Sequence, residues 1–233
     1  MKHLIETKDL SSLPITEYDR LILDSTKNEI IYRGGVTYEY VDLGLPSDLK
    51  WAKCNIGATS ETDAGLYFAW GETTGYTASQ VGTDKQFSWS DYKYGNDNNL
   101  TKYNQSDGKT VLESADDAAA QIMGGDWRMP TQTEFQELLS GTTNEWIANY
   151  NSTGVNGRKF TSKTNGNSIF IPAAGFCYDG SVYHVGDYGY VWSSSLDISD
   201  PGNAWYLGFN SGNCRMSNVY NRCYGLSVRG VRK

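Results

Sequence analysis

The stretch that decides the fold runs Ala204-Trp-Tyr-Leu-Gly-Phe-Asn-Ser-Gly-Asn-Cys-Arg-Met-Ser-Asn-Val-Tyr-Asn-Arg-Cys-Tyr224. Its apolar positions are Trp205, Leu207, Phe209 and Met216, and the positions between them carry Tyr, Asn, Ser, Gly, Arg, Cys and Val. We interpret the apolar positions as framework and the others as displayed residues. The first six residues predict a strand.

The displayed residue types are those of antibody binding loops. Tyr gives a large rigid contact area at low entropy cost, while Ser, Gly and Asn adapt their hydrogen bonds and Arg occurs at hot spots. The alternative is that Gly, Asn and Tyr only mark the turns and strands of a β-rich domain.

Residues 164–232 contain no Lys, Glu or Gln, although these types make up 28 of the 233 residues. Substitution of the adenines in an AAY codon for Asn reaches Tyr, His, Asp, Ser, Cys, Arg, Gly and Val. It never reaches Lys, Glu, Gln, Met, Trp or a stop codon. The tract fits this set if Trp205 and Met216 are fixed positions, which favours a diversified surface.

Length and composition predict one domain with a small appendage. A chain of 233 residues is long enough to bury a substantial core. Its 25 Gly, 17 Tyr and 7 Trp indicate a loop-rich fold that contains β-strands, and they argue against a helical bundle.

Charge restricts the partners. The net charge of −7 and pI near 4.9 argue against nucleic acid and anionic membranes, which need concentrated Lys and Arg. The expected partner is a protein or glycan receptor on a cell surface. No apolar run approaches the ~20 residues that span a bilayer, and the start, Met1-Lys-His-Leu-Ile-Glu6, is too polar for a signal peptide. We therefore expect an extracellular or virion-surface location, such as a phage tail, reached by another route or with the leader absent.

The first 36 residues differ from the rest. Leu21-Ile-Leu23 and Ile30-Ile-Tyr32 read as two strands of a hairpin, which is not stable alone. Further aliphatic residues precede it: Leu4, Ile5, Leu10, Leu13 and Ile15. We expect this segment to mediate attachment or self-association into a homo-oligomer, or else to cap the body with extra strands.

Residues 37–233 predict an α+β domain with two helices beside short antiparallel strands. One helix begins near Ser114–Asp117 and continues through Ala118–Met123 to Gly124. The other begins at Thr131, which has Glu134 three residues on, and ends before Gly141. The expected strands are Tyr38–Leu43, Leu66–Trp70, Phe160–Thr164, Ser168–Pro172, Gly189–Ser193, Ala204–Phe209 and Leu226–Arg232.

An ordered set of motifs carries a resemblance over about residues 38–232. The motifs are Val41-Asp-Leu-Gly-Leu-Pro-Ser-Asp-Leu-Lys-Trp51-Ala, Tyr67-Phe-Ala-Trp-Gly-Glu72, Trp127-Arg-Met-Pro130, Ile171-Pro-Ala-Ala-Gly175, Trp192-Ser-Ser-Ser195 and Leu226-Ser-Val-Arg229. The chain resembles the paralogous surface domains of Bacteroides and Fibrobacter relatives. That family is similar to the formylglycine-generating-enzyme branch of the C-type lectin fold.

The resemblance implies a C-type-lectin-like fold whose closing strands bring the two ends together. The variable proteins of diversity-generating retroelements use this branch and carry their diversified tract at the C-terminal end. On that comparison Trp127–Pro130 and Trp192–Ser195 are scaffold, and a variable tract at about 177–224 forms the binding face. Function on loops held by a rigid frame tolerates sequence change.

Catalysis is not expected, and neither is a cofactor. Formylglycine-generating enzymes need a reactive cysteine pair, which the four cysteines Cys54, Cys177, Cys214 and Cys223 do not supply by position. Cys54 reads as a small buried hydrophobic residue. A triad of Ser193, His184 and Asp179 can be written down, but no nucleophile-elbow pattern surrounds any Ser.

Metal signals are weak. The chain lacks C-x-x-C and the calcium motifs E-P-N, Q-P-D and W-N-D of sugar-binding C-type lectins. Asn96–Asn99, with Asp91 nearby, offers oxygen ligands suited to Ca²⁺, but such runs are usually turns. We interpret Asp116 and Asp117 as first-turn helix residues that interact with the helix dipole. A Cys214–Cys223 disulfide stays open at this separation.

The sequence therefore predicts a non-enzymatic receptor-binding protein. The alternative is an invariant cell-surface adhesin or glycan-binding module of the same fold. The expected ligand-binding residues are Tyr206, Gly208, Asn210, Ser211, Asn213, Cys214, Arg215, Ser217, Asn218, Val219, Asn221, Arg222 and Cys223, with help from Tyr183 and His184.

Overall fold

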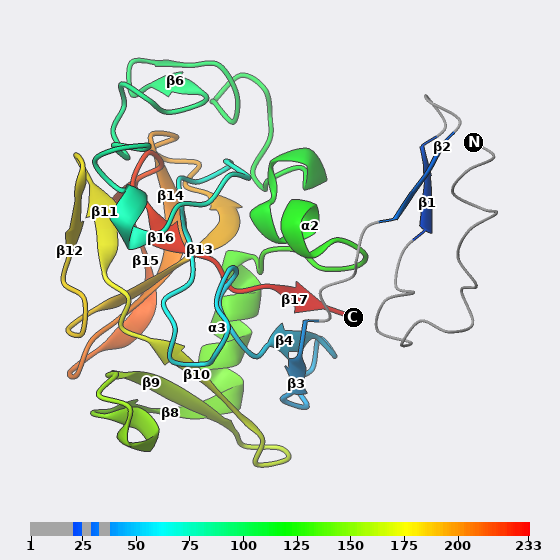
Figure 1. Cartoon of the computed structure of the whole chain (residues 1–233), viewed down its shortest axis with the longest axis vertical. Helices are drawn as coiled ribbons and strands as arrows, with labels where there is room; N and C mark the ends of the chain where they lie inside the picture. Colours follow the sequence, from blue (N-terminus) through cyan, green and yellow to red (C-terminus); the bar gives the residue numbers. More distant parts are fainter. Residues whose placement is uncertain (1–20, 25–28, 33–37) are drawn as a thin grey trace. The chain divides into compact units, whose positions relative to one another are not determined.

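The computed structural model describes residues 21–24, 29–32 and 38–233. The chain divides into two compact units, Met1–Tyr38 and Glu39–Lys233. Figure 1 shows the larger unit as small sheets around a single long helix. No helix among the described residues is long and apolar enough to cross a membrane.

The smaller unit contains the hairpin that the apolar runs predict. Strands β1 (Leu21–Asp24) and β2 (Glu29–Tyr32) pair antiparallel, with Leu21 opposite Tyr32 and Asp24 opposite Glu29. The aliphatic residues expected to aid attachment, from Leu4 to Ile15, lie outside the described residues.

Helix α3 (Gln132–Gly141) begins where the sequence predicts. The Thr131 hydroxyl accepts a hydrogen bond from the Glu134 backbone N–H, and the Glu134 carboxylate accepts one from the Thr131 N–H at 2.8 Å. Phe135 and Leu138 are buried on one face of the helix. This local capping box fixes the start of the helix that packs on the main sheet.

The start of helix α2 (Ala118–Met123) differs from the prediction. Asp117 is the N-cap and accepts from the Ala120 N–H at 2.9 Å, after a short 3₁₀ turn at Ser114–Asp116. Asp116 lies in the first turn of the 3₁₀ helix, and its buried carboxylate accepts hydrogen bonds from Lys93, Lys102 and Tyr103. Asp117 was expected in the first turn, but it is the N-cap that precedes α2.

The largest sheet has the order β15-β14-β13-β16-β5. Its strands are β5 (Tyr67–Phe68), β13 (Gly189–Leu196), β14 (Asn203–Phe209), β15 (Cys214–Asn221) and β16 (Leu226–Ser227). The pair β13 and β16 is parallel, and the other pairs are antiparallel. The strands β13, β14 and β15 carry most of the predicted tract.

Smaller sheets surround it (Figure 1). One has the order β10-β9-β8, and another has the order β17-β4-β3. Two-stranded pairs form from β11 with β12 and from β6 with β7. The bounds are β3 (Tyr40–Asp42), β4 (Lys50–Ala52), β6 (Gly95–Asn96), β7 (Asn99–Leu100), β8 (Thr142–Ile147), β9 (Gly157–Ser162), β10 (Ser168–Pro172), β11 (Phe176–Tyr178), β12 (Ser181–Tyr183) and β17 (Val231–Arg232).

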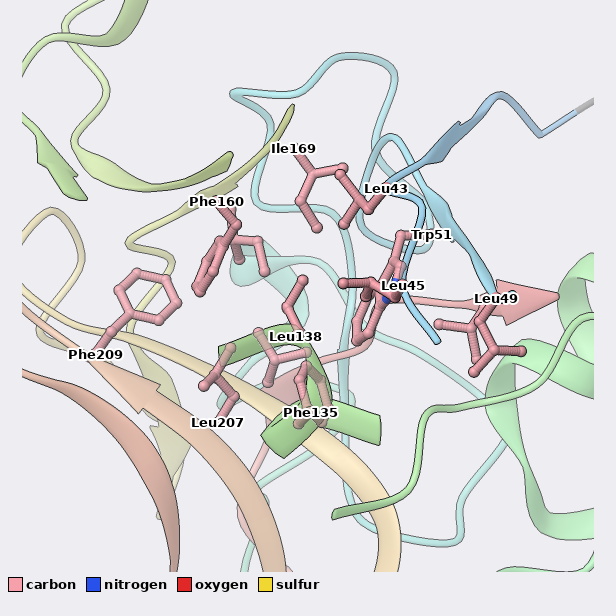
Figure 2. Packing of buried hydrophobic residues seen from close by; sticks show 13 residues of the cluster. Leu43, Leu45, Leu49, Trp51, Phe135, Leu138, Phe160, Ile169, Leu207 and Phe209 are labelled. Atoms are coloured by element: carbon pink, nitrogen blue, oxygen red, sulfur yellow. The ribbon is translucent and has the colours of Figure 1, made fainter. Parts of the chain in front are cut away.

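The main core lies between α3 and these sheets. Figure 2 shows Phe135 and Leu138 between Leu207 of β14 and Trp51 of β4. The rings of Trp51 and Phe135 lie 5.3 Å apart at their centroids. Phe209 and Met216 pack into or against this cluster, so the inward positions of β14 and β15 are framework.

A buried arginine near the end of the chain links the C-terminal strands to earlier strands of the larger unit. Arg229 is fully buried and donates to Asn55 Oδ1 and to the carbonyls of Ala52, Lys53 and Phe170. Burial lowers its pKa to about 10. Arg229, which ends the last motif of the resemblance, therefore ties the C-terminal strands to β4 and β10.

The α+β class is confirmed, since two α-helices and mostly antiparallel strands make up the described residues. The single strand expected over Leu226–Arg232 is wrong, because β16 and β17 join different sheets. The strands that were not predicted are β4, β6, β7, β8, β11, β12 and β15.

Candidate functional site

The two faces of the sheet formed by β13, β14 and β15 have different surroundings. Val191, Leu207 and Phe209 point to the core. Tyr190, Trp192 and Tyr206 alternate with them along the strands and occupy the opposite face. Trp192 is covered, and its Nε1 donates to the Phe68 carbonyl at 2.8 Å. The remainder of that face is open.

The open part of the outer face forms a pocket of about 200 Å³. It is lined by Tyr188, Tyr190, Tyr206, Gly208, Phe209, Asn210, Asn213, Arg215, Ser217, Val219 and Tyr220. We call it the tyrosine pocket. It lies over the strands drawn from yellow to orange in Figure 1.

Three tyrosines form the wall of the pocket. The rings of Tyr206 and Tyr220 stack with centroids 4.9 Å apart and an interplanar angle of 21°. Tyr190 lies 5.1 Å from Tyr220, whose hydroxyl donates to the Tyr190 hydroxyl at 3.2 Å. Tyr190 and Tyr206 are almost fully buried, so the wall is fixed by packing.

A β-bulge directs Tyr220 to this face. Tyr206 pairs with Ser217, but Ala204 pairs with Tyr220, so β15 has one extra residue between the two pairs. A bulge turns a side chain that regular alternation would send to the other face. Both Val219 and Tyr220 consequently line the pocket.

Gly208 and Arg215 define the open side of the pocket. They are paired across β14 and β15, and Gly208 also pairs with Tyr190. Gly208 has no side chain to fill the space, and a Cβ there would lie 3.0 Å from the Tyr206 ring. The exposed Arg215 side chain therefore stands beside a gap at the centre of the sheet.

Hydrogen bonds within the turn and from Arg158 hold the turn between β14 and β15 in place. Asn210 Oδ1 accepts from the N–H groups of Gly212 and Asn213, and the Asn210 N–H donates to the Asn213 carbonyl. Arg158 of β9 donates to the carbonyls of Asn210 and Asn213 at 2.8 and 3.1 Å. The loop end of the pocket is thus fastened to a different sheet.

Aromatic residues continue the surface beyond the pocket. Phe176 of β11 stacks on Tyr183 at 5.4 Å and on His184 at 6.0 Å, and it contacts Tyr220 at 5.1 Å. Tyr183 is 39% exposed. The predicted helpers Tyr183 and His184 therefore belong to an aromatic surface that adjoins the pocket.

The buried Tyr190 and Tyr206 hydroxyls are protonated at neutral pH. Burial, the Tyr220 hydrogen bond and neighbouring tyrosines raise the pKa of Tyr190 well above its ordinary value. Burial also raises the pKa of Tyr206, which Ser217 and Arg215 only partly oppose. Both phenols can therefore donate hydrogen bonds as well as accept them.

The predicted site residues divide into groups. The tyrosine pocket brings together Tyr206, Gly208, Asn210, Asn213, Arg215, Ser217 and Val219. Ser211 is exposed in the adjoining turn, and Asn218 is turned away because its Nδ2 donates to Asp197. Cys214 packs against the core, and Asn221 is half-buried opposite Asn203 at the other end of β15.

Two predicted ligand residues are wrong. Arg222 is fully buried and donates to the Tyr92 hydroxyl and to the carbonyls of Lys102, Tyr103 and Pro201. Cys223 is fully buried as well. A side chain without exposed surface cannot contact a receptor, so both belong to the framework.

One framework assignment needs a smaller correction. Trp205 is half-buried and lies outside the core cluster, whereas Leu207 and Phe209 are inside it. Trp205 lies where the register of β14 shifts against both β13 and β15, whereas Leu207 and Phe209 lie in the regularly paired part of the strand.

The sequence reasoning missed Tyr188, Tyr190 and Tyr220. Tyr188 and Tyr190 fall within the expected variable tract of about 177–224 but were not named as ligand residues; they flank Gly189, and alternation places them on the face opposite to Val191. That alternation was a usable signal. Tyr220 carried none, because its direction depends on the bulge.

Other candidate chemistries do not assemble. The Ser193 hydroxyl is committed to the Trp205 carbonyl at 2.8 Å, and His184 is exposed beside aromatic rings. Asp91 accepts from the backbone of Gln86 and Ser88, and Asn96 caps the turn between β6 and β7. All four cysteines are free thiols, so Cys214 and Cys223 are not joined.

No metal-binding group of three or more His, Cys, Asp or Glu occurs in the part of the chain that the structure describes. Comparisons with protein-family models, curated proteins and solved structures find no match for this chain.

Proposed function

We propose that this protein is a non-enzymatic receptor-binding protein that uses the tyrosine pocket and the adjoining aromatic surface. The observation that carries the proposal is that the sequence pattern of the tract agrees with where its residues lie in the structure. Seven of the residues between 206 and 219 that read as displayed line one pocket, while Leu207 and Phe209 between them belong to the core. A surface of Tyr, Asn, Ser and Arg on a packed sheet has the composition of an antibody binding surface, in which Tyr gives rigid contact area and the small polar residues adapt their hydrogen bonds.

We further propose that the body has a C-type-lectin-like fold and that the tract is diversified by a retroelement. The codon pattern and the ordered motifs support this. The framework adds support, because Phe209 and Leu207 hold β14 while Arg158 holds the turn, so the outward residues can change without loss of the core. The surface location, on a cell or a phage tail, belongs to the same proposal.

Sequencing of the flanking DNA and of related isolates tests the diversified form. We expect a reverse transcriptase gene, a near-copy of the C-terminal coding repeat, and changes at Asn213, Arg215, Ser217 and Val219. The fully buried Arg222 should stay constant. Scattered changes without a template repeat would instead favour the invariant adhesin or glycan-binding module, which the same pocket also supports.

A binding experiment tests the site itself. Purified protein is applied to an array of glycans and bacterial surface proteins, with Val219→Trp as the pocket-filling variant. Val219 lines the pocket and is 67% exposed, so the change should block ligands without disturbing the core. The matched control is Ile122→Trp on α2, an apolar residue that is 37% exposed and does not line the pocket. Equal binding by both variants would exclude the pocket.

A further inference from the structure

The tyrosine pocket is sized for one ring. Its volume of about 200 Å³ is below the roughly 300–1,000 Å³ of sites that enclose a drug-sized ligand. It therefore receives one group of a larger ligand. That group would be bordered by the rings of Tyr188, Tyr190, Tyr206 and Tyr220 and by the polar side chains of Asn210, Asn213 and Ser217.

These walls match a sugar ring better than an aliphatic or aromatic protein side chain. A protein anchor residue is best held by a fully apolar pocket that excludes water. Here four of the five aromatic lining residues are tyrosines that carry a hydroxyl, Phe209 being the exception, and Val219, the one aliphatic lining residue, is mostly exposed. A pyranose has C–H groups for the negative face of a tyrosine ring and hydroxyls around its edge for the polar groups.

Arg215 supplies the only charge among the lining residues, all of which the structure describes. It forms no ion pair with any described carboxylate, whereas Lys50, Lys85 and Arg128 are each paired. A guanidinium offers a fork of donors that fits a carboxylate. An unpaired fork beside neutral aromatic walls favours an anionic group on the ligand.

We propose that the tyrosine pocket binds a sugar acid, with the ring against the tyrosines and the carboxylate on Arg215. This inference rests on the proposed function and names its ligand class. The chain carries a net charge of −7, so long-range attraction of an anion is absent and selectivity has to come from contact at Arg215.

A matched pair of probes isolates the carboxylate. Methyl β-D-glucuronide and methyl β-D-glucoside differ only in a carboxylate in place of a hydroxymethyl group. Both are titrated into ¹⁵N-labelled full-length protein, and the amide shifts of Gly208 and Arg215 give the site and the Kd. We expect the glucuronide to bind about fivefold more tightly, with the preference falling as salt rises.

Arg215→Gln should remove the preference and leave the weak glucoside binding. The control is Lys159→Gln on β9, which changes the net charge equally, forms no ion pair among the described residues and lies outside the pocket. The control should retain the preference. Preference that survives Arg215→Gln, or no shift at Gly208 with either sugar, overturns the inference.

Acetyl-aspartyl-amide serves as the peptide arm. Tighter binding of this probe than of the glucuronide would overturn the sugar assignment and indicate an acidic protein ligand. The proposed function fails separately: if Val219→Trp abolishes array binding while the glucuronide shows no preference, the receptor-binding face stands and only the sugar-acid assignment falls.

Discussion

Gly189 of β13 pairs with Phe209 of β14, and the Phe209 ring occupies the space that a Cβ at Gly189 would need. The ring is 2% exposed and belongs to the core cluster, so it cannot move aside without loss of packing. We expect Gly189→Ala to lower the free energy of unfolding by about 2–3 kcal/mol. Urea melts of the variant measure this, and an unchanged midpoint would contradict the packing described for this pair.

Phe209→Ala and Asn213→Tyr separate framework from display. Removal of the buried ring should cost about 3–5 kcal/mol, because it leaves a cavity. Asn213 is exposed and lines the pocket, so a Tyr there should change stability by less than about 0.5 kcal/mol. The half-buried Trp205 should give an intermediate loss on replacement by Ala. Equal losses at positions 209 and 213 in denaturant melts would remove the display interpretation.

Arg222→Lys tests the buried arginine in the tract. The guanidinium reaches three backbone carbonyls and one phenol at 2.8 to 3.0 Å, and it lies 5.0 Å from the Trp70 ring. An ammonium group cannot reproduce this fork, so we expect a loss of about 3 kcal/mol. Arg215→Ala, on the exposed side of the same strand region, should change stability by less than about 0.5 kcal/mol. Thermal melts compare the two, and similar melting temperatures would contradict the burial of Arg222.

Asp116→Asn should change how the free energy of unfolding depends on pH at acidic pH. Burial alone would raise the pKa of Asp116, but hydrogen bonds from Lys102, Tyr94, Tyr103 and Lys93 outweigh it and hold the pKa well below its ordinary value. Because the pKa of Asp116 is lower in the folded than in the unfolded chain, its ionised form stabilises the fold at pH values above the unfolded pKa near 4. That stabilisation is lost as the pH falls from the unfolded pKa toward the folded pKa.

We therefore expect Asp116→Asn to cost about 3 kcal/mol at pH 7 and progressively less below about pH 4. Urea melts at pH 7, 5 and 3 measure the difference from the unmodified chain. The exposed Asp48, 86% exposed at its side chain, provides the control through Asp48→Asn. A difference that is independent of pH would show that Asp116 is not ionised in its buried cluster.

Thiol counting tests the absence of a disulfide. Burial raises the pKa of Cys214 to about 11 and of Cys223 to about 12, so neither is a reactive thiolate at neutral pH. The denatured, unreduced chain should give four thiols with Ellman's reagent, and native Cys177 and Cys223 should react slowly because they are fully buried. A count of two would establish a disulfide.

Local chemistry explains which elements could be predicted. The Thr131–Glu134 capping box needs only neighbouring residues, and helix α3 follows it as expected. Strand β15 contains two Asn, a Ser and an Arg among its eight residues, which weaken the β-propensity that Val219 and Tyr220 supply. It is a strand because it pairs along β14 and because Met216 and Cys214 pack on the core. Tertiary contacts of this kind leave no mark in the local sequence.

The same contrast holds in the site. Gly208 was predictable because alternation along the expected strand Ala204–Phe209 separates inward from outward positions. Arg215, Ser217 and Val219 were predicted from their residue types, which resemble those of antibody binding loops. The burial of Arg222 was not predictable, because its acceptors Lys102 and Tyr103 lie about 120 positions earlier in the chain. An arginine in a polar run looks displayed unless those distant carbonyls are known.

The closure made by β17 and Arg229 has a consequence for synthesis. Val231 pairs with Trp51, and the Arg229 guanidinium meets the Ala52 carbonyl across 177 positions. In a nascent chain β4 leaves the ribosome long before Arg229 and β17 do. The apolar surface around Trp51 therefore stays exposed to solvent until these partners emerge. Contacts of such sequence separation fold slowly. The body should consequently acquire its protease resistance only after β17 has emerged, and a ribosome stalled before Arg229 would present an open sheet to chaperones.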